Sequence, residues 1–166
     1  MTAFAQLPTT RRGTVGEDIA KAFFVRRGCA PFGPVVDGSH PIDLTLLTPK
    51  GDVVLVDVKT YPRRHVRPET GIDLPDWHTY QHLAERNPGV TVYLLFVDPF
   101  ERAMYGGAIT SLVDHAREEG SKVYFPLKAL RVVSWLEPHE VRKIGPPKDA
   151  GRYRHVKPYY LNLPTP

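Results

Sequence analysis

Asp43, Asp57 and Lys59 have side chains that can bind a hard cation and assist an attacking water. Two aspartates that face each other on neighbouring strands repel, and this destabilises a hairpin unless something neutralises them. Mg²⁺ is a natural neutraliser, because it commonly takes one or two carboxylates and completes its shell with water and phosphate oxygens. Beside such an ion, Lys59 could orient or deprotonate a water, or stabilise charge on a phosphorus. The three residues predict a magnesium site, provided that the fold brings them together.

A β-hairpin is the element that would do so. Apolar residues dominate 42–47 and 53–59, and residues 48–52 between them are rich in turn formers, a combination typical of a hairpin. Centring the loop on its middle residue places Asp43 directly opposite Asp57. Because side chains alternate along a strand, Lys59 shares the face of Asp57. The opposite face is predicted to be core and carries Ile42, Leu44, Leu46, Val54, Val56 and Val58.

Helices are predicted on both sides of this hairpin. After a loose leader over 1–12, a capping-box pattern indicates a helix that begins at Thr14 and ends at Gly28. A second helix is expected from Pro75 to about Arg86. The remaining predicted elements are a short strand within 29–37, a buried strand over 91–97, a strand and a helix over 104–118, and short peripheral elements at 122–127 and 132–136. This order predicts an α/β domain with a mixed sheet.

Composition limits the class of protein. The 166 residues, 42% hydrophobic and 24% charged, suit one domain, expected over 1–144 and followed by an extended tail over 145–166. A single cysteine excludes a disulfide framework, and neither a membrane span nor a signal sequence is indicated. Histidine spacing does not fit zinc, and a glycine-rich phosphate loop is missing. Because the sequence indicates neither disulfides nor secretion nor a membrane span, we expect a protein of the reducing cytoplasm.

A basic loop should leave the second strand of the hairpin. The chain has 22 Lys and Arg against 18 Asp and Glu, a mild excess that suits an anionic partner. The loop contains Tyr61, Arg63, Arg64 and Arg67, and its functional interpretation is a clamp on the phosphates of a nucleic acid. The alternative is a solvated loop of ordinary basic composition.

The tail over 145–166 interleaves basic and aromatic residues, as surfaces that stack single strands do. Packing of its tyrosines on the domain, a homodimer contact and docking on a protein partner are the alternatives, and the sequence leaves them open.

The polar residues of the predicted hairpin and of its two flanking helices occur in an order that resembles the active-site signature of the PD-(D/E)xK nuclease superfamily. The matching residues are Glu17, Asp43, Asp57, Lys59 and Gln81. The first corresponds to an acidic residue on the helix before the hairpin, and the last to a polar residue on the helix after it. That polar residue is a feature of the recombination-exonuclease and Holliday-junction-resolvase branches. The resemblance covers about residues 13–110 and implies a restriction-endonuclease-like core of order αβββαβ.

The resemblance also assigns roles. The implied metal ligands are Asp43, Asp57, the backbone carbonyl of Val58 and, directly or through water, Glu17. Lys59 would serve the attacking water, and Gln81 would position Lys59 or a phosphate. One departure from the pattern is that a residue separates Pro41 from Asp43, whereas the family name implies that they adjoin.

Each of these residues also has a plain structural interpretation. The capping box alone explains Glu17. Asp43 could form a structural salt bridge, and Asp57 with Lys59 could be solvated charges at a strand end. Gln81 could be merely exposed on its helix.

The function expected from this reasoning is hydrolysis of DNA phosphodiester bonds with Mg²⁺, for which Mn²⁺ can substitute because the ligands are hard oxygens. The alternative is a catalytically silent accessory with the same fold that binds DNA or a protein partner. Exonuclease or endonuclease action, and DNA or RNA as substrate, stay open.

Overall fold

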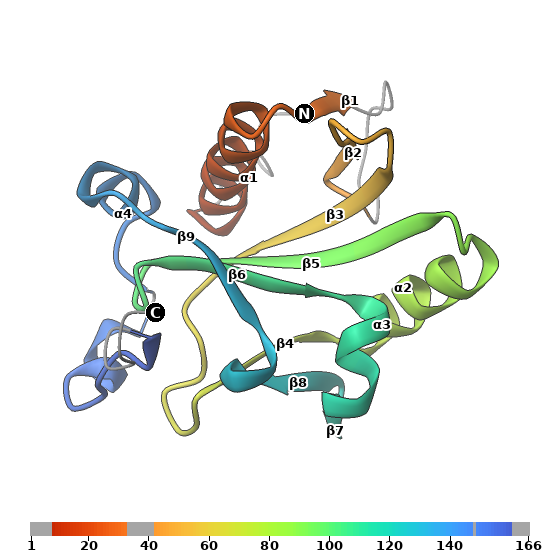
Figure 1. The fold of residues 1–166 in the computed structure, drawn as a ribbon. Coiled ribbons are helices and arrows are strands. Elements are labelled where there is room, and N and C mark those ends of the chain that lie inside the picture. The colour runs from red at the N-terminus through yellow and green to blue at the C-terminus, as the bar shows by residue number, and fades with distance from the viewer. Residues whose placement is uncertain (1–7, 33–41, 148, 161–166) are drawn as a thin grey trace, which may run out of the picture.

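Six strands form the main sheet of the protein. The structure is a computed structural model that describes residues 8–32, 42–147 and 149–160. In spatial order the strands are β1 (Ala30–Phe32), β2 (Leu44–Leu47), β3 (Val53–Thr60), β5 (Val90–Asp98), β6 (Ala103–Ala108) and β9 (Arg131–Trp135). β3 and β5 run parallel, and the other neighbours are antiparallel. The sheet is therefore mixed, as predicted (Figure 1).

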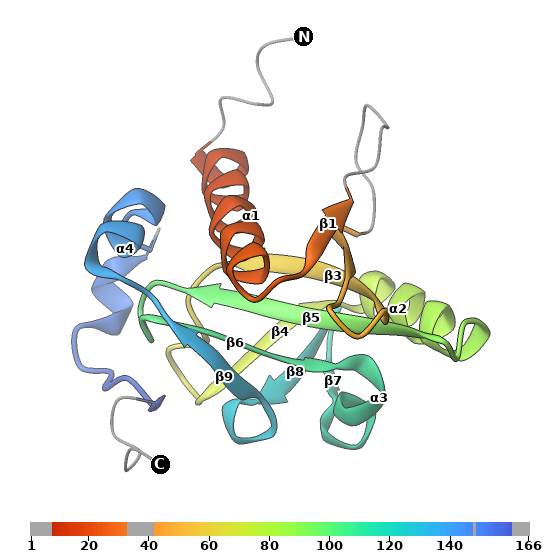
Figure 2. The same ribbon diagram turned by 45° about the horizontal axis from the view of Figure 1, so that its top comes forward.

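Both faces of this sheet are covered (Figures 1 and 2). One face packs against α1 (Pro8–Arg26) and α4 (Pro138–Ile144). The other packs against α2 (Leu74–Arg86), α3 (Ile109–Leu112) and a second sheet of β4 (Glu69–Asp73), β8 (Lys122–Pro126) and β7 (Arg117–Glu119). Short 3₁₀ helices span Val113–His115, Leu127–Ala129 and Ala150–Tyr153. The apolar run in β5 serves both cores, because Leu94 and Phe96 face α2 whereas Leu95 and Val97 face α1.

The hairpin has the predicted register. Leu47 pairs with Val53, and the antiparallel ladder continues to Leu44 opposite Val56. The predicted apolar face is buried under α1, with the exception of Ile42, which packs in the core under α2 instead. The chain bends just before β2, so alternation no longer decides where Ile42 points.

Helix α1 begins before the expected position. It spans Pro8–Arg26, so residues 8–12 belong to the helix rather than to a leader, and Thr14 is no N-cap. The Thr14 hydroxyl donates to the carbonyl of Thr10 at 3.2 Å, one turn back in the same helix, a bond that Ser and Thr form inside helices. No helix among the described residues is long and apolar enough to cross a membrane.

Two elements on the α2 side also differ from the expectation. The loop predicted over 60–73 contains β4, which pairs with β8. The segment expected to be peripheral at 122–127 is central to the second core, because Val123, Phe125 and Leu127 are fully buried. These side chains lie under α2, where Trp77 and Phe125 are in contact with ring centroids 5.2 Å apart.

The C-terminal segment packs on the domain up to Tyr160. The Tyr160 ring is buried, and its hydroxyl donates to the carbonyl of Leu127 at 2.8 Å. The Tyr153 hydroxyl donates to the carbonyl of Arg63 at 2.6 Å, so the segment lies beside the loop after β3 (Figure 1). Among the alternatives for this tail, packing of its tyrosines on the domain is the one that the structure shows.

Close packing of α1 on β3 sets the position of Glu17, and Gly16 permits it. A Cβ at Gly16 would lie 1.7 Å from Thr60 Oγ1 and 2.8 Å from Thr60 Cβ, whereas a Cβ at Gly13 would meet only Glu17 Oε1, at 3.8 Å. We expect Gly16→Ala to lower the free energy of unfolding by about 1–3 kcal/mol through overpacking. Gly13→Ala is the control and should be neutral or stabilising by up to about 1 kcal/mol. Urea denaturation measures both, and equal effects would contradict this account of the packing.

Candidate active site

Asp57 and Lys59 lie side by side at the end of β3 and face α2. Lys59 Nζ is 3.1 Å from Asp57 Oδ1 and 3.3 Å from Asp76 Oδ2, which lies on the first turn of α2. The Asp57 side chain is only 4% exposed, whereas that of Lys59 is 24% exposed. The pair is therefore buried on the Asp57 side and open to the surface on the Lys59 side.

Asp43 reaches the same place from the other strand of the hairpin. Its Oδ2 accepts a hydrogen bond from the backbone N–H of Val58 at 2.6 Å, and its negative charge acts on Asp57. Because the N–H and C=O of one strand residue point to the same side, the Val58 carbonyl also faces the edge where Asp43 lies. The predicted proximity of the two aspartates is confirmed.

The ionisation of Asp57 is strongly perturbed. Burial raises the pKa of its carboxyl from 3.8 to about 7; Lys59 lowers it, and the nearby Asp43 raises it further. Asp57 Oδ2 is buried and, among the described residues, has no hydrogen-bond partner. A buried carboxylate oxygen without a partner is costly, and a cation at this point would remove that cost.

Lys59 keeps its proton in this environment. Burial lowers the pKa of its ammonium group, but the carboxylates of Asp57 and Asp76 outweigh burial and raise that pKa above 10.5. A lysine with a raised pKa is a poor general base at neutral pH. The arrangement therefore favours charge stabilisation and hydrogen-bond donation by Lys59 over removal of a proton from water.

Glu17 approaches from α1, on the opposite face of the sheet. It is half-buried, and it lines a cavity of about 170 Å³ together with Asp43. In the parts of the chain that the structure describes, no three Asp, Glu, His or Cys side chains converge as a metal cluster. Glu17 thus belongs to the neighbourhood of the aspartates, and direct ligation by Glu17 stays a prediction.

Helix α2 contributes two further residues to the site: Asp76, which the sequence reasoning missed, and Tyr80, a neighbour of Gln81 that it had considered as an alternative. Asp76 pairs with Lys59, and the buried Tyr80 interacts with Asp57 through its hydroxyl and lowers the pKa of that carboxyl. Gln81, the predicted residue on this helix, is half-buried and lies about 100° around the helix axis from Tyr80. The spacing of Asp76 and Tyr80, one helical turn apart beside the buried Trp77, was the signal that could have identified them.

Arg63 corrects the prediction of an exposed phosphate clamp. Its side chain is 5% exposed, and Nε donates to Glu101 Oε1 at 2.6 Å. The other guanidinium nitrogens donate to the backbone carbonyls of Arg64, Arg67 and Lys157 at 2.7, 3.1 and 2.9 Å. A guanidinium that is buried and bonded in this way serves the fold, since a phosphate outside cannot reach it.

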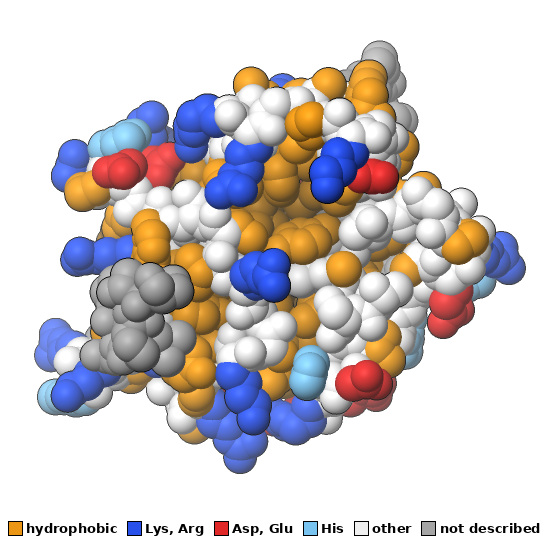
Figure 3. All heavy atoms as spheres, viewed as in Figure 1, with side chains coloured by type: hydrophobic (Ala, Val, Ile, Leu, Met, Phe, Trp, Pro, Cys, Tyr) orange, Lys and Arg blue, Asp and Glu red, His pale blue; other side chains and the backbone are white. Residues whose placement is uncertain are grey.

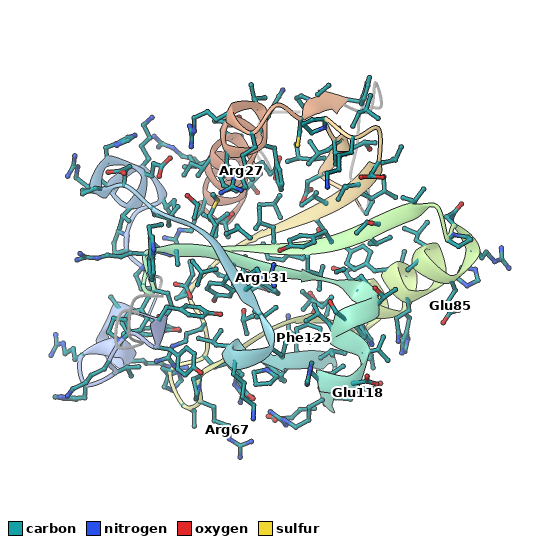
Figure 4. All side chains as sticks on the ribbon, viewed as in Figure 1. Arg27, Arg67, Glu85, Glu118, Phe125 and Arg131 are labelled. Carbon is teal, nitrogen blue, oxygen red and sulfur yellow. The ribbon has the colours of Figure 1, made fainter. Side chains whose placement is uncertain are left out.

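The other residues of this loop have different surroundings. Arg64 is half-exposed and pairs with Glu69 at 2.8 Å and Glu119 at 3.3 Å. Tyr61 donates its hydroxyl hydrogen to a backbone carbonyl of β4. Arg67 extends away from the domain (Figure 4), where Lys and Arg side chains gather along the lower edge of the face in Figure 3. Contacts of Tyr61, Arg64 and Arg67 with DNA stay predictions.

The oxygens at the end of the hairpin suit a hard divalent cation. Asp43 and Asp57 supply carboxylates, Val58 supplies a carbonyl on the same side, and the unpartnered Oδ2 of Asp57 marks the place where a positive charge is needed. Mg²⁺ and Mn²⁺ prefer such oxygen ligands and retain water in their shells. The donor set therefore fits the group that the sequence predicted.

Comparison with known proteins identifies the fold. No protein-family model matches the sequence, and no curated protein matches it. Among solved structures, the Holliday junction resolvase Hjc of Archaeoglobus fulgidus superposes with a TM-score of 0.55 at 13% sequence identity, over 74% of this chain and 92% of the resolvase chain. The chain thus has the restriction-endonuclease-like α/β fold of this resolvase, with a mixed sheet flanked by helices.

Proposed function

We propose that the protein is a metal-dependent nuclease that hydrolyses DNA phosphodiester bonds at Asp43, Asp57 and Lys59. The observation that carries the proposal is the buried Asp57 carboxylate, whose Oδ2 has no hydrogen-bond partner among the described residues and whose pKa is raised to about 7 beside Asp43 and Lys59. Perturbed titratable groups of this kind cluster at functional sites. The similarity to a Holliday junction resolvase supports DNA as the substrate and membership of the PD-(D/E)xK superfamily.

The metal and its ligands have distinct tasks. Bound Mg²⁺ or Mn²⁺ would supply Lewis-acid chemistry, lowering the pKa of water and neutralising charge on the phosphate. Asp43, Asp57 and the Val58 carbonyl would hold the ion, and Glu17 would support it directly or through water. Asp57 would hold the ion as a carboxylate, so below about pH 7 its proton would have to leave when the site is filled.

Lys59 and its neighbours on α2 act on the reacting groups. As an ammonium ion, Lys59 donates hydrogen bonds to the attacking water or to a phosphate oxygen and offsets the negative charge that develops there. Asp76 holds the Lys59 ammonium at 3.3 Å, and Tyr80 interacts with Asp57 through its hydroxyl. Both are positioning residues in this proposal, because they act through Lys59 and Asp57.

A labelled DNA panel tests the proposal. Single-stranded DNA, blunt duplex, flap and four-way junction are incubated with Mg²⁺, Mn²⁺, Ca²⁺ or EDTA. We expect cleavage with Mg²⁺ and Mn²⁺ and none with EDTA, and the resolvase likeness favours the branched substrates. Asp57→Ala should abolish cleavage, whereas Asp114→Ala, which removes an exposed aspartate of the 3₁₀ helix Val113–His115, should leave the rate within about twofold.

Binding of DNA without cleavage, equal with EDTA and in Asp57→Ala, would refute the nuclease proposal. It would instead favour an accessory protein that retains the fold without the chemistry. A homodimer and a protein partner for the C-terminal segment stay predictions, which sedimentation of the same protein with each DNA substrate would address.

A further inference from the structure

Two adjoining cavities lead away from Lys59 along the C-terminal segment. The proximal cavity, about 450 Å³, is lined by Arg12, Val58, Lys59 and Thr60 among others. The distal cavity, about 460 Å³, is lined by Arg64, His65, Thr70, Lys122, Tyr124 and Arg152 among others. Tyr61, Pro62, Asp149 and Tyr153 line both. The cavities therefore adjoin, and each has a volume within the range of about 300–1,000 Å³ that is usual for small-molecule sites.

The walls of these cavities are held rigidly. One wall is the loop after β3, and the other is the C-terminal segment, which lies beside it in Figure 1. Tyr153 joins the two walls, because its hydroxyl donates to the carbonyl of Arg63 and its ring contacts Phe100 and His65 with centroids 4.8 and 6.0 Å apart. A preformed wall costs little entropy when a ligand binds.

Positive charge dominates the lining. Asp149 is the one acidic residue among the described residues that line the two cavities. Several of the basic residues are balanced by carboxylates behind them, since Arg64 pairs with Glu69 and Lys122 pairs with Asp73 at 2.7 Å. Such paired cations contribute less attraction to a phosphate than unpaired ones.

Each cavity nevertheless has one basic residue that, among the described residues, forms either no ion pair or only a long and exposed one. In the proximal cavity, Arg12 donates to the carbonyls of Ile144 and Pro146 at 3.2 and 2.6 Å, which fixes the guanidinium without neutralising it. In the distal cavity, Arg152 is 63% exposed and forms a long ion pair of 4.0 Å with Asp149, which is itself 59% exposed; such an exposed pair contributes little in water. The two cavities therefore offer one available positive charge each.

The distal cavity also has surfaces that suit a base. Tyr124 and Tyr153 line it, and the Arg64 guanidinium lies 4.3 Å from the centroid of the Tyr124 ring. Aromatic rings and guanidinium planes are the groups on which unpaired bases stack.

We propose that the two cavities hold two successive unpaired nucleotides of a strand whose cleaved phosphate lies at Asp57 and Lys59. The inference rests on the proposed nuclease function and adds its substrate class, a DNA strand that is single-stranded next to the cut. Arg12 and Arg152 each face one phosphate, and in the distal cavity a base stacks on Tyr153 or on the Arg64 guanidinium that covers Tyr124. A base that stacks on protein side chains in such a cavity is unpaired, so the arrangement favours a single strand over a duplex.

Binding of a fluorescent six-nucleotide oligothymidylate, measured by anisotropy in EDTA, tests this inference without catalysis. Arg152→Ala should weaken binding about 5–10-fold. The slope of the logarithm of affinity against the logarithm of salt concentration should also become shallower, by the amount that one phosphate contact contributes. The matched control is Arg154→Ala, two residues away, exposed and outside the lining of both cavities. We expect it to change binding less than twofold, and a blunt duplex should be insensitive to both variants.

The outcomes separate this inference from the proposed function. If the parent protein does not bind the oligonucleotide, or if the two variants bind it equally, the cavities are not a strand site, whatever the cleavage assay shows. If Arg152→Ala alone weakens binding but no metal supports cleavage, the strand site stands and the nuclease proposal fails. Equal thermal stability of the two variants would show that neither effect comes from unfolding.

Discussion

Asp57→Asn should lose DNA cleavage by about three orders of magnitude and yet be more stable than the parent protein at pH 8. The catalytic loss follows from removal of a charged metal ligand, and three orders of magnitude correspond to about 4 kcal/mol of transition-state stabilisation. Asparagine has nearly the same shape as aspartate, so the packing around position 57 should persist. The gain in stability follows from the charge that asparagine lacks.

The sign of the stability effect comes from the pKa of Asp57. Burial raises the pKa from 3.8 to about 7 in the folded protein, so the folded state binds the proton more tightly than the unfolded state does. The free energy of unfolding therefore falls as pH rises from about 4 to about 7. Above pH 7 the folded protein bears the full cost of a buried charge, and the shift corresponds to about 2–4 kcal/mol. Asp57→Asn avoids this cost.

Urea denaturation of both proteins in EDTA, at pH 8 and again at pH 5, measures the effect. We expect Asp57→Asn to be more stable by about 2 kcal/mol or more at pH 8, and the difference should shrink at pH 5. Asp114→Asn, at an exposed position, should change stability by less than about 0.5 kcal/mol at either pH. A variant less stable than the parent at pH 8 would show that the Asp57 carboxylate stabilises the fold.

Glu101→Ala should lower the free energy of unfolding by about 3–5 kcal/mol, because it leaves the buried Arg63 cation without its partner. Glu101 is fully buried, and its Oε1 lies 2.6 Å from Arg63 Nε. Its two oxygens also accept hydrogen bonds from the backbone N–H groups of Tyr159 and Tyr160 at 2.9 and 3.0 Å. The substitution therefore also removes two hydrogen bonds that hold the C-terminal segment on the domain.

Equilibrium denaturation and limited proteolysis together check this second prediction. Trypsin should cleave the C-terminal segment of Glu101→Ala at Arg152 or Arg154 much sooner than that of the parent protein. Glu118→Ala serves as the control, since Glu118 is exposed and points away from the domain (Figure 4). A loss of less than about 1 kcal/mol, with unchanged proteolysis, would mean that the segment is held without the Arg63–Glu101 pair.

The local sequence pattern was sufficient to predict the hairpin and the positions of its charged side chains. Alternation and the turn placed Leu47 opposite Val53, put Asp57 and Lys59 on one face and brought Asp43 close, as the structure confirms. These relations depend on residues at most about sixteen positions apart, so strand geometry alone determines them. The mixed sheet followed in the same way from the order of strongly patterned segments.

Contacts between distant segments lay beyond such reasoning. The capping-box pattern at Thr14 was misleading, because tertiary packing of α1 outweighs a local capping preference. Arg63 was expected at the surface, but it is buried by Glu101 and the carbonyl of Lys157, residues 38 and 94 positions further along the chain. No property of the loop sequence predicts those partners.

By itself, the sequence determined which residues could bind a cation, which strands present them and which class of fold those strands build. Only the tertiary structure decided that Asp57 is buried with an unpartnered oxygen, that Asp76 and Tyr80 reach the site from α2, and that the C-terminal segment borders two cavities beside Lys59. The physical reason is that residue type and spacing specify backbone periodicity and side-chain chemistry locally. Burial and electrostatic environment arise only when distant segments pack together.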